Sequence, residues 1–150
     1  MKVEELGHLV LYVKDVQRSA SFYGDVLGWH AVIPATTGSP IAAFSSGRTH
    51  HELLLIEVGE AATPQARGRH LGLYHFGLKI GDSDDELREA LVRLREAGVT
   101  VGGMADHTVS HSLYVADPDG NEIELYVDVP GVDWKNEPSL VTAPVKDLRL

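Results

Sequence analysis

Two histidines stand at the same place in a repeated octet, and a glutamate follows late in the chain. Residues 8–15 read HLVLYVKD and residues 75–82 read HFGLKIGD, and the octets align without a gap at an offset of 67. Glu124 lies in the later segment NEIELYV. Two imidazoles and one carboxylate suit Fe(II), Mn(II) or a similar ion. The chain has 8 His and no Cys, so a thiolate site is excluded.

Strand alternation predicts which way these side chains point. In each octet the apolar residues in second, fourth and sixth place form one face, so His8 and His75 lie on the other face. In the last segment, aliphatic residues alternate with Glu122, Glu124 and Tyr126. The aliphatic set belongs under a helix. Glu124 therefore lies on the histidine side, provided that the two halves pair into one sheet system.

A helix is expected after each octet. Asp15 is a typical N-cap for the first helix, and Gly28 is a natural stop. The second helix begins with the capping-box sequence Ser-Asp-Asp-Glu at 83–86 and ends at Gly98. The apolar faces that would cover the strands are Val16, Ala20, Tyr23 and Leu27 in the first helix, and Leu87, Ala90, Leu91 and Leu94 in the second.

Short apolar runs separated by turn residues follow each helix. They are His30–Pro34, Ile41–Phe44 and Glu52–Val58 in the first half, and Val99–Met104, Ser112–Ala116 and Asn121–Val127 in the second. The sequence DPDG at 117–120 is typical of a hairpin turn. The prediction is an α+β protein with two tandem βαβββ modules in one domain, 1–150. Module one covers about 6–58, a linker 59–71, module two about 72–128, and an extended tail 129–150.

Composition excludes several classes of function. The chain has 150 residues and a net charge of −9, whereas nucleic-acid binding requires a basic surface. It contains no apolar run of the ~20 residues that a membrane-spanning helix needs. The first residues, MKVEELGH, do not resemble a signal peptide. We therefore expect a cytoplasmic protein without nucleic-acid or membrane partners.

These motifs resemble the vicinal oxygen chelate superfamily, which includes glyoxalase I, bleomycin-resistance proteins, fosfomycin-resistance enzymes and type I extradiol dioxygenases. The resemblance covers about residues 6–128. It rests on the stretches LGHLVLYVKDVQRSASFYGDVLGW, LYHFGLKIGD and DHTVSHSLYVADPDGNEIELYVD. It implies that the two modules form a curved mixed-sheet cup around a divalent metal held by His8, His75 and Glu124. By analogy it also implies a homodimer.

Two details resemble the extradiol dioxygenase branch. Residues 107–124 resemble its signature, with His107, Tyr114 and Glu124 in place, although Ala105 departs from the usual choice. The segment HHELLL at 50–55 resembles the one that carries the acid–base histidine, which would be His51. The resemblance implies that Fe(II) is favoured over Mn(II), Ni(II) or Zn(II), and that O2 and a catechol-like small molecule are the substrates. His51 would move a proton, while His107 and Tyr114 would hydrogen-bond to substrate oxygens.

Other interpretations stay open. A glyoxalase-type isomerase or lyase would use the same metal as a Lewis acid, and needs a fourth ligand that only His51 or Glu52 offers in that segment. A resistance-type binding protein would use the cup as an apolar pocket. Each of these three residues also has a purely structural interpretation. His51 is typical of a solvated hairpin, His107 of a turn, and Tyr114 of packing in a core.

Overall fold

The chain divides into two compact units, Met1–Gln65 and Ala66–Leu150, with the boundary inside the predicted linker 59–71. The computed structural model describes residues 1–65 and 68–150, so residues 66 and 67 of that linker lie outside the described part. Each unit has the order strand, helix, three strands, which confirms the two predicted βαβββ modules and the α+β class. The grouping of both units into one domain stays a prediction.

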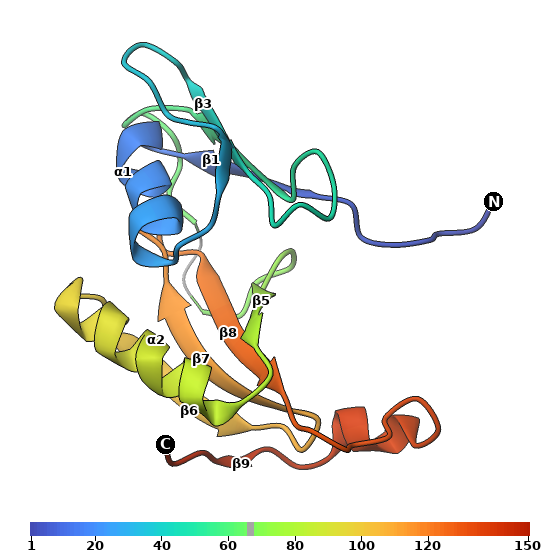
Figure 1. Ribbon diagram of the computed structural model, residues 1–150. Coiled ribbons are helices and arrows are strands. Elements are labelled where there is room, and N and C mark those ends of the chain that lie inside the picture. Colours follow the sequence, from blue (N-terminus) through green and yellow to red (C-terminus); the bar gives the residue numbers. More distant parts are fainter. Residues whose placement is uncertain (66–67) are drawn as a thin grey trace. The chain divides into compact units, whose positions relative to one another are not determined.

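The first unit is a four-stranded mixed sheet with one short helix (Figure 1). Its elements are β1 (Leu9–Val13), α1 (Val16–Ser21), a π-helical turn (Phe22–Val26), β2 (Ala31–Ile33), β3 (Ile41–Phe44) and β4 (Leu53–Glu57). The strand order is β1-β4-β3-β2. The first and last strands of the module are parallel, with Leu9 opposite Leu53, and the other pairs are antiparallel.

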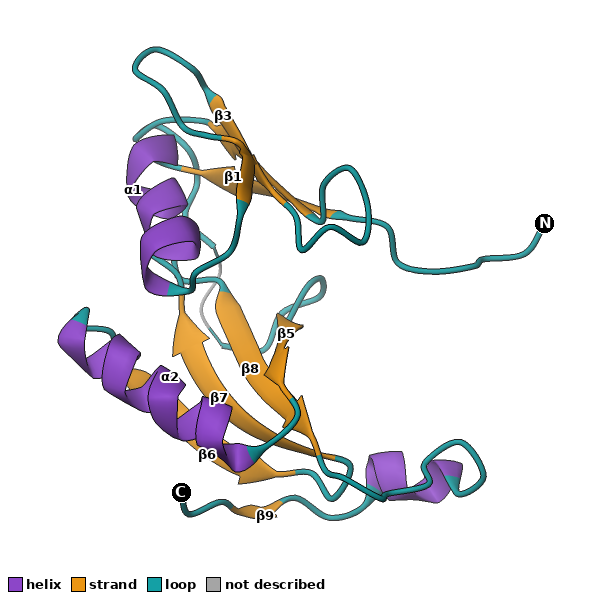
Figure 2. Cartoon of the chain, in the orientation of Figure 1, coloured by secondary structure: helices purple, strands orange, loops and turns teal. Residues whose placement is uncertain are grey.

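The second unit repeats this topology with longer elements (Figure 2). They are β5 (His75–Gly81), α2 (Asp84–Glu96), β6 (Val101–Asp106), β7 (Ser110–Ala116), β8 (Glu122–Asp128), a 3₁₀ turn (Pro138–Thr142) and β9 (Lys146–Asp147). The order is β5-β8-β7-β6-β9, and β5 is parallel to β8. Because β5 and β8 occupy the places of β1 and β4, the sequence repeat is also a structural repeat. None of the helices in residues 1–65 and 68–150 is long and apolar enough to cross a bilayer.

Alternation along the strands separates a core face from a polar face in each sheet. In β1, Leu11 and Val13 are buried whereas Tyr12 is exposed. In β8 the predicted aliphatic face is fully buried. The residues that form the two cores include Val13, Val16, Tyr23, Phe44, Leu53 and Leu55 in the first unit, and Leu87, Leu94, Leu113, Ile123, Leu125 and Val127 in the second. Burial of these side chains is the main stabilising contribution in each unit.

Both predicted helix starts are confirmed. The Asp15 side chain accepts a hydrogen bond from the Arg18 N–H at 3.0 Å, and Ser83 and Glu86 form the reciprocal capping box. The first helix differs from prediction because its second half is a π-helical turn rather than a continuous α-helix. The neighbouring aromatic residues Phe22 and Tyr23 are both buried, and the wider π turn lets both side chains reach the core.

The tail returns to the sheet instead of staying extended. Its last strand, β9, pairs antiparallel with β6 and covers the edge of that strand (Figure 2). Leu148 is buried beside it, whereas Trp134 and Val141 are about half exposed. An unpaired edge strand is prone to pair with other chains, so this short strand protects the sheet.

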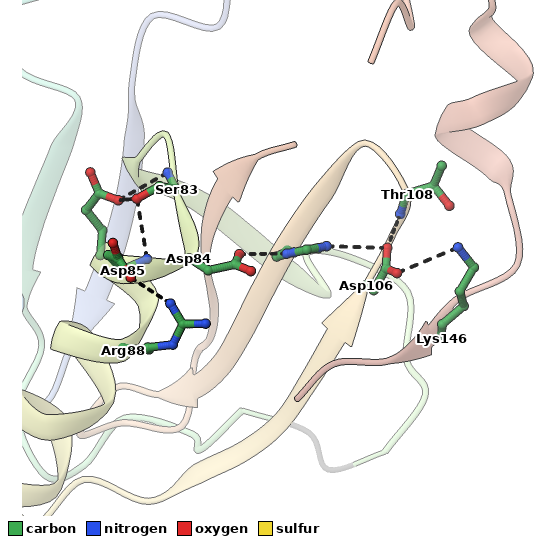
Figure 3. A network of polar contacts seen from close by, with 9 residues as sticks. Ser83, Asp84, Asp85, Arg88, Asp106, Thr108 and Lys146 are labelled. Carbon is green, nitrogen blue, oxygen red and sulfur yellow. Dashed lines mark hydrogen bonds and ion pairs between the residues drawn. The ribbon is translucent and has the colours of Figure 1, made fainter. Parts of the chain in front are cut away.

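A chain of polar contacts connects this tail to α2 (Figure 3). The His111 imidazole in β7 lies 2.7 Å from an Asp84 carboxylate oxygen at the start of α2, and 3.8 Å from Asp106 in β6. Asp106 also accepts a hydrogen bond from the N–H of Thr108, and lies 3.6 Å from the Lys146 ammonium group in β9. Thr108 has a positive φ of 71°, so this contact holds a strained hairpin turn.

We expect Asp106→Asn to change how stability depends on pH. The N–H of Thr108, with smaller effects from Lys146 and His111, holds the pKa of Asp106 below its ordinary value even though burial opposes the shift. Because the pKa is lower in the folded than in the unfolded protein, ionised Asp106 stabilises the fold. This contribution is complete above the ordinary aspartate pKa of about 3.9 and is lost as the pH falls below it. The free energy of unfolding from urea titrations should therefore decrease less on acidification in Asp106→Asn than in wild type. Asp147→Asn, at an exposed carboxyl group, is the control. Parallel curves for wild type and Asp106→Asn would contradict the prediction.

Candidate functional site

The polar face of the second sheet carries the first candidate ligands. In the parallel pair β5 and β8, His75 lies opposite Glu122, and Gly77 lies opposite Glu124. The buried aliphatic residues of β8 point to the other face, toward α2. The Nε2 atom of His75 is 3.4 Å from Oε2 of Glu124. The prediction that these two side chains share a face is confirmed.

The two oxygens of Glu124 have different surroundings. Its Oε1 accepts a hydrogen bond of 2.6 Å from the Ser112 hydroxyl and one of 3.2 Å from the Tyr114 hydroxyl. Its Oε2 lies beside His75 instead. Ser112 is fully buried, so its hydroxyl is a fixed donor. One carboxylate oxygen is therefore held by the protein, while the other is directed toward the imidazole.

Sequence reasoning did not assign a role to Ser112. The available signal was its place in β7, two residues before Tyr114 and so on the same face. The sequence also offered no reason to assign a role to Gly77. A Cβ at this position would lie 3.2 Å from the Tyr126 ring and 3.5 Å from Oε2 of Glu124. Glycine therefore leaves the side of Oε2 open.

His107 and Tyr114 form a pair next to Glu124. The Nε2 atom of His107 is 2.7 Å from the Tyr114 hydroxyl and 3.7 Å from Oε1 of Glu124. Both side chains come from the β6–β7 hairpin, where His107 follows β6 directly. The pKa of Tyr114 is raised because burial and the negative charge of Glu124 disfavour the phenolate. Tyr114 is therefore a neutral hydrogen-bond donor at physiological pH.

The first unit brings three histidines together. The ring of His51 is 4.6 Å from that of His8, whereas His50 is 6.4 Å from it. The Nδ1 atoms of His50 and His51 are 2.6 Å apart, so one ring can donate a hydrogen bond to the other. Burial lowers the pKa of His51, and the neighbouring His50 and His8 add to this effect. A lowered pKa keeps His51 neutral and able to accept a proton near neutrality.

Glu52, the alternative fourth ligand, is engaged elsewhere. Its Oε2 accepts hydrogen bonds from the N–H and hydroxyl of Ser46, at 2.6 and 2.5 Å, and its Oε1 accepts one from Nε of Arg48 at 3.0 Å. Burial raises the pKa of Glu52, but these hydrogen bonds outweigh it and the pKa is lower than usual. Glu52 therefore fastens the loop before β4.

The candidate ligands are distributed over both units. Among the described residues, no three His, Asp or Glu side chains are grouped as a metal site. The second unit contributes an imidazole nitrogen and a carboxylate oxygen that face each other, in His75 and Glu124. His8 precedes β1 at the position equivalent to His75 in the repeat. The donor set fits a divalent ion with nitrogen and oxygen ligands.

A cavity of about 510 Å³ lies in the second unit near these residues. Tyr74, Tyr114 and Glu122 line it, together with Gly102 and Gly103 of β6. The two glycines leave the backbone of β6 uncovered there. The volume of this cavity lies in the range of small-molecule sites and is sufficient for a substrate with one or two rings.

Comparisons with known proteins find one family model and several similar proteins. Residues 5–125 match the family model described as the Glyoxalase/Bleomycin resistance protein/Dioxygenase superfamily. The chain is 35% identical over 132 residues to catechol-2,3-dioxygenase of Bacillus subtilis (strain 168), a match that covers 88% of this chain and 44% of that protein. It is 30% identical over 125 residues to glutathione transferase FosA of Serratia marcescens, covering 83% of this chain and 82% of the transferase.

The solved structures include a glyoxalase/dioxygenase from Nostoc punctiforme with a TM-score of 0.68 and 25% identity. That match covers 83% of this chain and 90% of the Nostoc chain. The chain thus spans less than half the length of the catechol dioxygenase, but most of the length of the transferase and of the Nostoc protein.

We expect the Tyr114 phenol to resist ionisation in alkali. An ordinary tyrosine has a pKa of about 10, and burial beside Glu124 raises that of Tyr114. In ¹³C NMR of protein labelled at the tyrosine Cζ atom, the signal of Tyr114, assigned by its loss in Tyr114→Phe, should shift only above that pH. Glu124→Gln removes the negative charge and should bring this transition to lower pH. A Tyr114 signal that titrates near pH 10 in wild type would contradict the geometry described here.

Proposed function

The chain belongs to the glyoxalase/bleomycin resistance protein/dioxygenase superfamily, and on that premise we propose that it is a metal-dependent, extradiol-type dioxygenase. Its substrates would be O2 and a catechol-like diol. The observation that carries this proposal is the arrangement around Glu124, where the His107–Tyr114 pair lies on the same sheet face as His75. His107, Tyr114 and Glu124 are the three residues that match the extradiol signature which residues 107–124 resemble.

The proposed ligands are His8, His75 and Glu124, with Fe(II) as the favoured ion. In support, Oε1 of Glu124 is already hydrogen-bonded, so Oε2 is the oxygen that remains for a metal. Three protein ligands leave coordination positions for small molecules, and a bound divalent ion would lower the pKa of a coordinated diol hydroxyl. Mn(II), Ni(II) and Zn(II) accept the same ligand types.

The remaining residues would handle protons and orientation. His51, neutral because burial and its histidine neighbours lower its pKa, would accept a proton from a diol hydroxyl group. The Tyr114 hydroxyl, which donates to Oε1 of Glu124 in this structure, would turn to donate its hydrogen bond to a substrate oxygen. His107 would orient that hydroxyl through their 2.7 Å contact. Holding the substrate in one orientation against these groups supplies the proximity contribution to catalysis. The cavity lined by Tyr74 and Tyr114 would take the aromatic ring.

A second candidate is Lewis-acid chemistry of the glyoxalase or fosfomycin-resistance type with the same metal. The 30% identity to glutathione transferase FosA over 82% of that protein's length favours it. The hydrogen bonds that hold Glu52 argue against it as the fourth ligand of a glyoxalase centre, which leaves His51 as the candidate for that place. Homodimer formation remains part of the proposal, based on analogy within the superfamily.

The deciding experiment measures oxygen uptake. We expect wild type loaded with Fe(II) under nitrogen to consume O2 when catechols are added, with a coloured ring-fission product. His8→Ala, His75→Ala and Glu124→Ala should lose tight metal binding and oxygen uptake while keeping the far-UV circular dichroism of wild type, because none of the three is a buried core residue. His30→Ala is the control, because this exposed histidine has no proposed role. Full activity after removal of metal by a chelator, or activity only on thiol–ketoaldehyde adducts with Ni(II) or Zn(II), would overturn the dioxygenase proposal.

His51→Phe tests the proton-transfer role separately. Phenylalanine fills a similar space but cannot accept a proton, so turnover should fall by ~10²–10⁴ while metal content stays at the wild-type level. His30→Phe is the matched control, because this exposed histidine has no proposed role. Equal turnover numbers for wild type and His51→Phe would remove His51 from the mechanism.

A further inference from the structure

Two buried polar atoms face each other without a hydrogen bond next to the candidate ligands. Among the described residues, Nδ1 of His75 and Oε1 of Glu122 are buried and have no hydrogen-bond partner. They are 3.7 Å apart, and the two residues are opposite neighbours in the parallel pair β5–β8. Buried polar groups are almost always hydrogen-bonded. A small side-chain rotation would shorten this contact to a hydrogen bond from the imidazole N–H to the carboxylate.

This contact decides which nitrogen of His75 is available. A neutral imidazole carries one proton, on Nδ1 or on Nε2. With the proton on Nδ1 and directed to Glu122, the lone pair of Nε2 faces Oε2 of Glu124. With the proton on Nε2, the N–H would point at Oε2 of Glu124 and block both ligand atoms. Glu122 therefore determines whether Nε2 of His75 and Oε2 of Glu124 can both offer an electron pair to a metal.

Glu122 is itself held in place. The hydroxyl of Tyr74 is hydrogen-bonded to Glu122, and the Tyr74 ring packs edge-on against that of His75 at 4.6 Å. Tyr74 therefore contacts both members of the pair. Glu122 is also the only charged side chain in the described lining of the nearby cavity. Its Oε1 is directed to His75, which gives this carboxylate a structural task besides lining the cavity.

We propose that Glu122 is a positioning residue that fixes His75 in the tautomer protonated at Nδ1, and so reserves Nε2 for the metal. The inference rests on the proposed function only where it says what the tautomer is for. The contact between Glu122 and His75 does not depend on a bound metal. Carboxylates that accept the second N–H of a metal-bound imidazole typically change metal affinity by about 10- to 100-fold when they are removed.

The test uses two readouts. Long-range ¹H–¹⁵N NMR at about pH 8, where an ordinary histidine is neutral, reports the His75 tautomer in the metal-free protein. Wild type should show the form protonated at Nδ1, and Glu122→Ala should shift the population toward Nε2–H. Calorimetric titration with Mn(II) should then give an affinity lower by about 10- to 100-fold in Glu122→Ala.

Glu122→Gln is the conservative variant. Its side-chain oxygen still accepts the hydrogen bond, so the tautomer should stay as in wild type, with a smaller loss of affinity. Glu89→Ala, on the exposed face of α2, is the control for a lost negative charge. If Glu122→Ala does not fold, the comparison of Glu122→Gln with wild type still reports the tautomer.

The outcomes separate this inference from the proposed function. A wild-type His75 that carries its proton on Nε2 would overturn the inference, as would an unchanged tautomer and affinity in Glu122→Ala. If the tautomer shifts as expected but wild type binds no Mn(II) or Fe(II), the role of Glu122 stands and the proposed metal function fails.

Discussion

The parallel pairing of β5 with β8 is the constraint on which the second unit depends. It aligns His75 with Glu122 and Gly77 with Glu124, and strand alternation then buries Ile123 and its aliphatic neighbours under α2. A shift of one residue in this register would exchange the two faces and bring the carboxylates into the core. The hydrophobic core therefore fixes the chemistry, because the register that buries the aliphatic side chains is also the one that exposes the candidate ligands.

Contacts within the sheet then distinguish the two oxygens of Glu124 from each other, and the two ring nitrogens of His75 from each other. Ser112 and Tyr114 engage one oxygen of Glu124, and Glu122 faces one nitrogen of His75, so the two atoms that remain face each other. Such preorganisation lowers the cost of ordering ligands when a metal binds. It also requires few residues, because all five lie on the three adjacent strands β5, β8 and β7.

The superfamily is compatible with several reactions, and the fold does not choose among them. The contacts of individual residues are more selective. Glu52, which would complete a four-ligand glyoxalase centre, is bound to Ser46 and Arg48, whereas His107 and Tyr114 are paired next to Glu124. The first observation leaves His51 as the candidate fourth ligand of a glyoxalase centre, and the second is the basis of the proposed ring cleavage.

The sequence alone determined the repeat, both helix caps, the alternation of faces and the shared face of His75 and Glu124, because these follow from local periodicity and short-range hydrogen bonding. The π turn at Phe22–Val26, the return of the tail as β9 and the roles of Ser112 and Glu122 were decided by tertiary structure. Each of these depends on which side chain or strand edge lies opposite in space. Periodicity gives the face on which a side chain lies, but only packing gives the partner that it meets there.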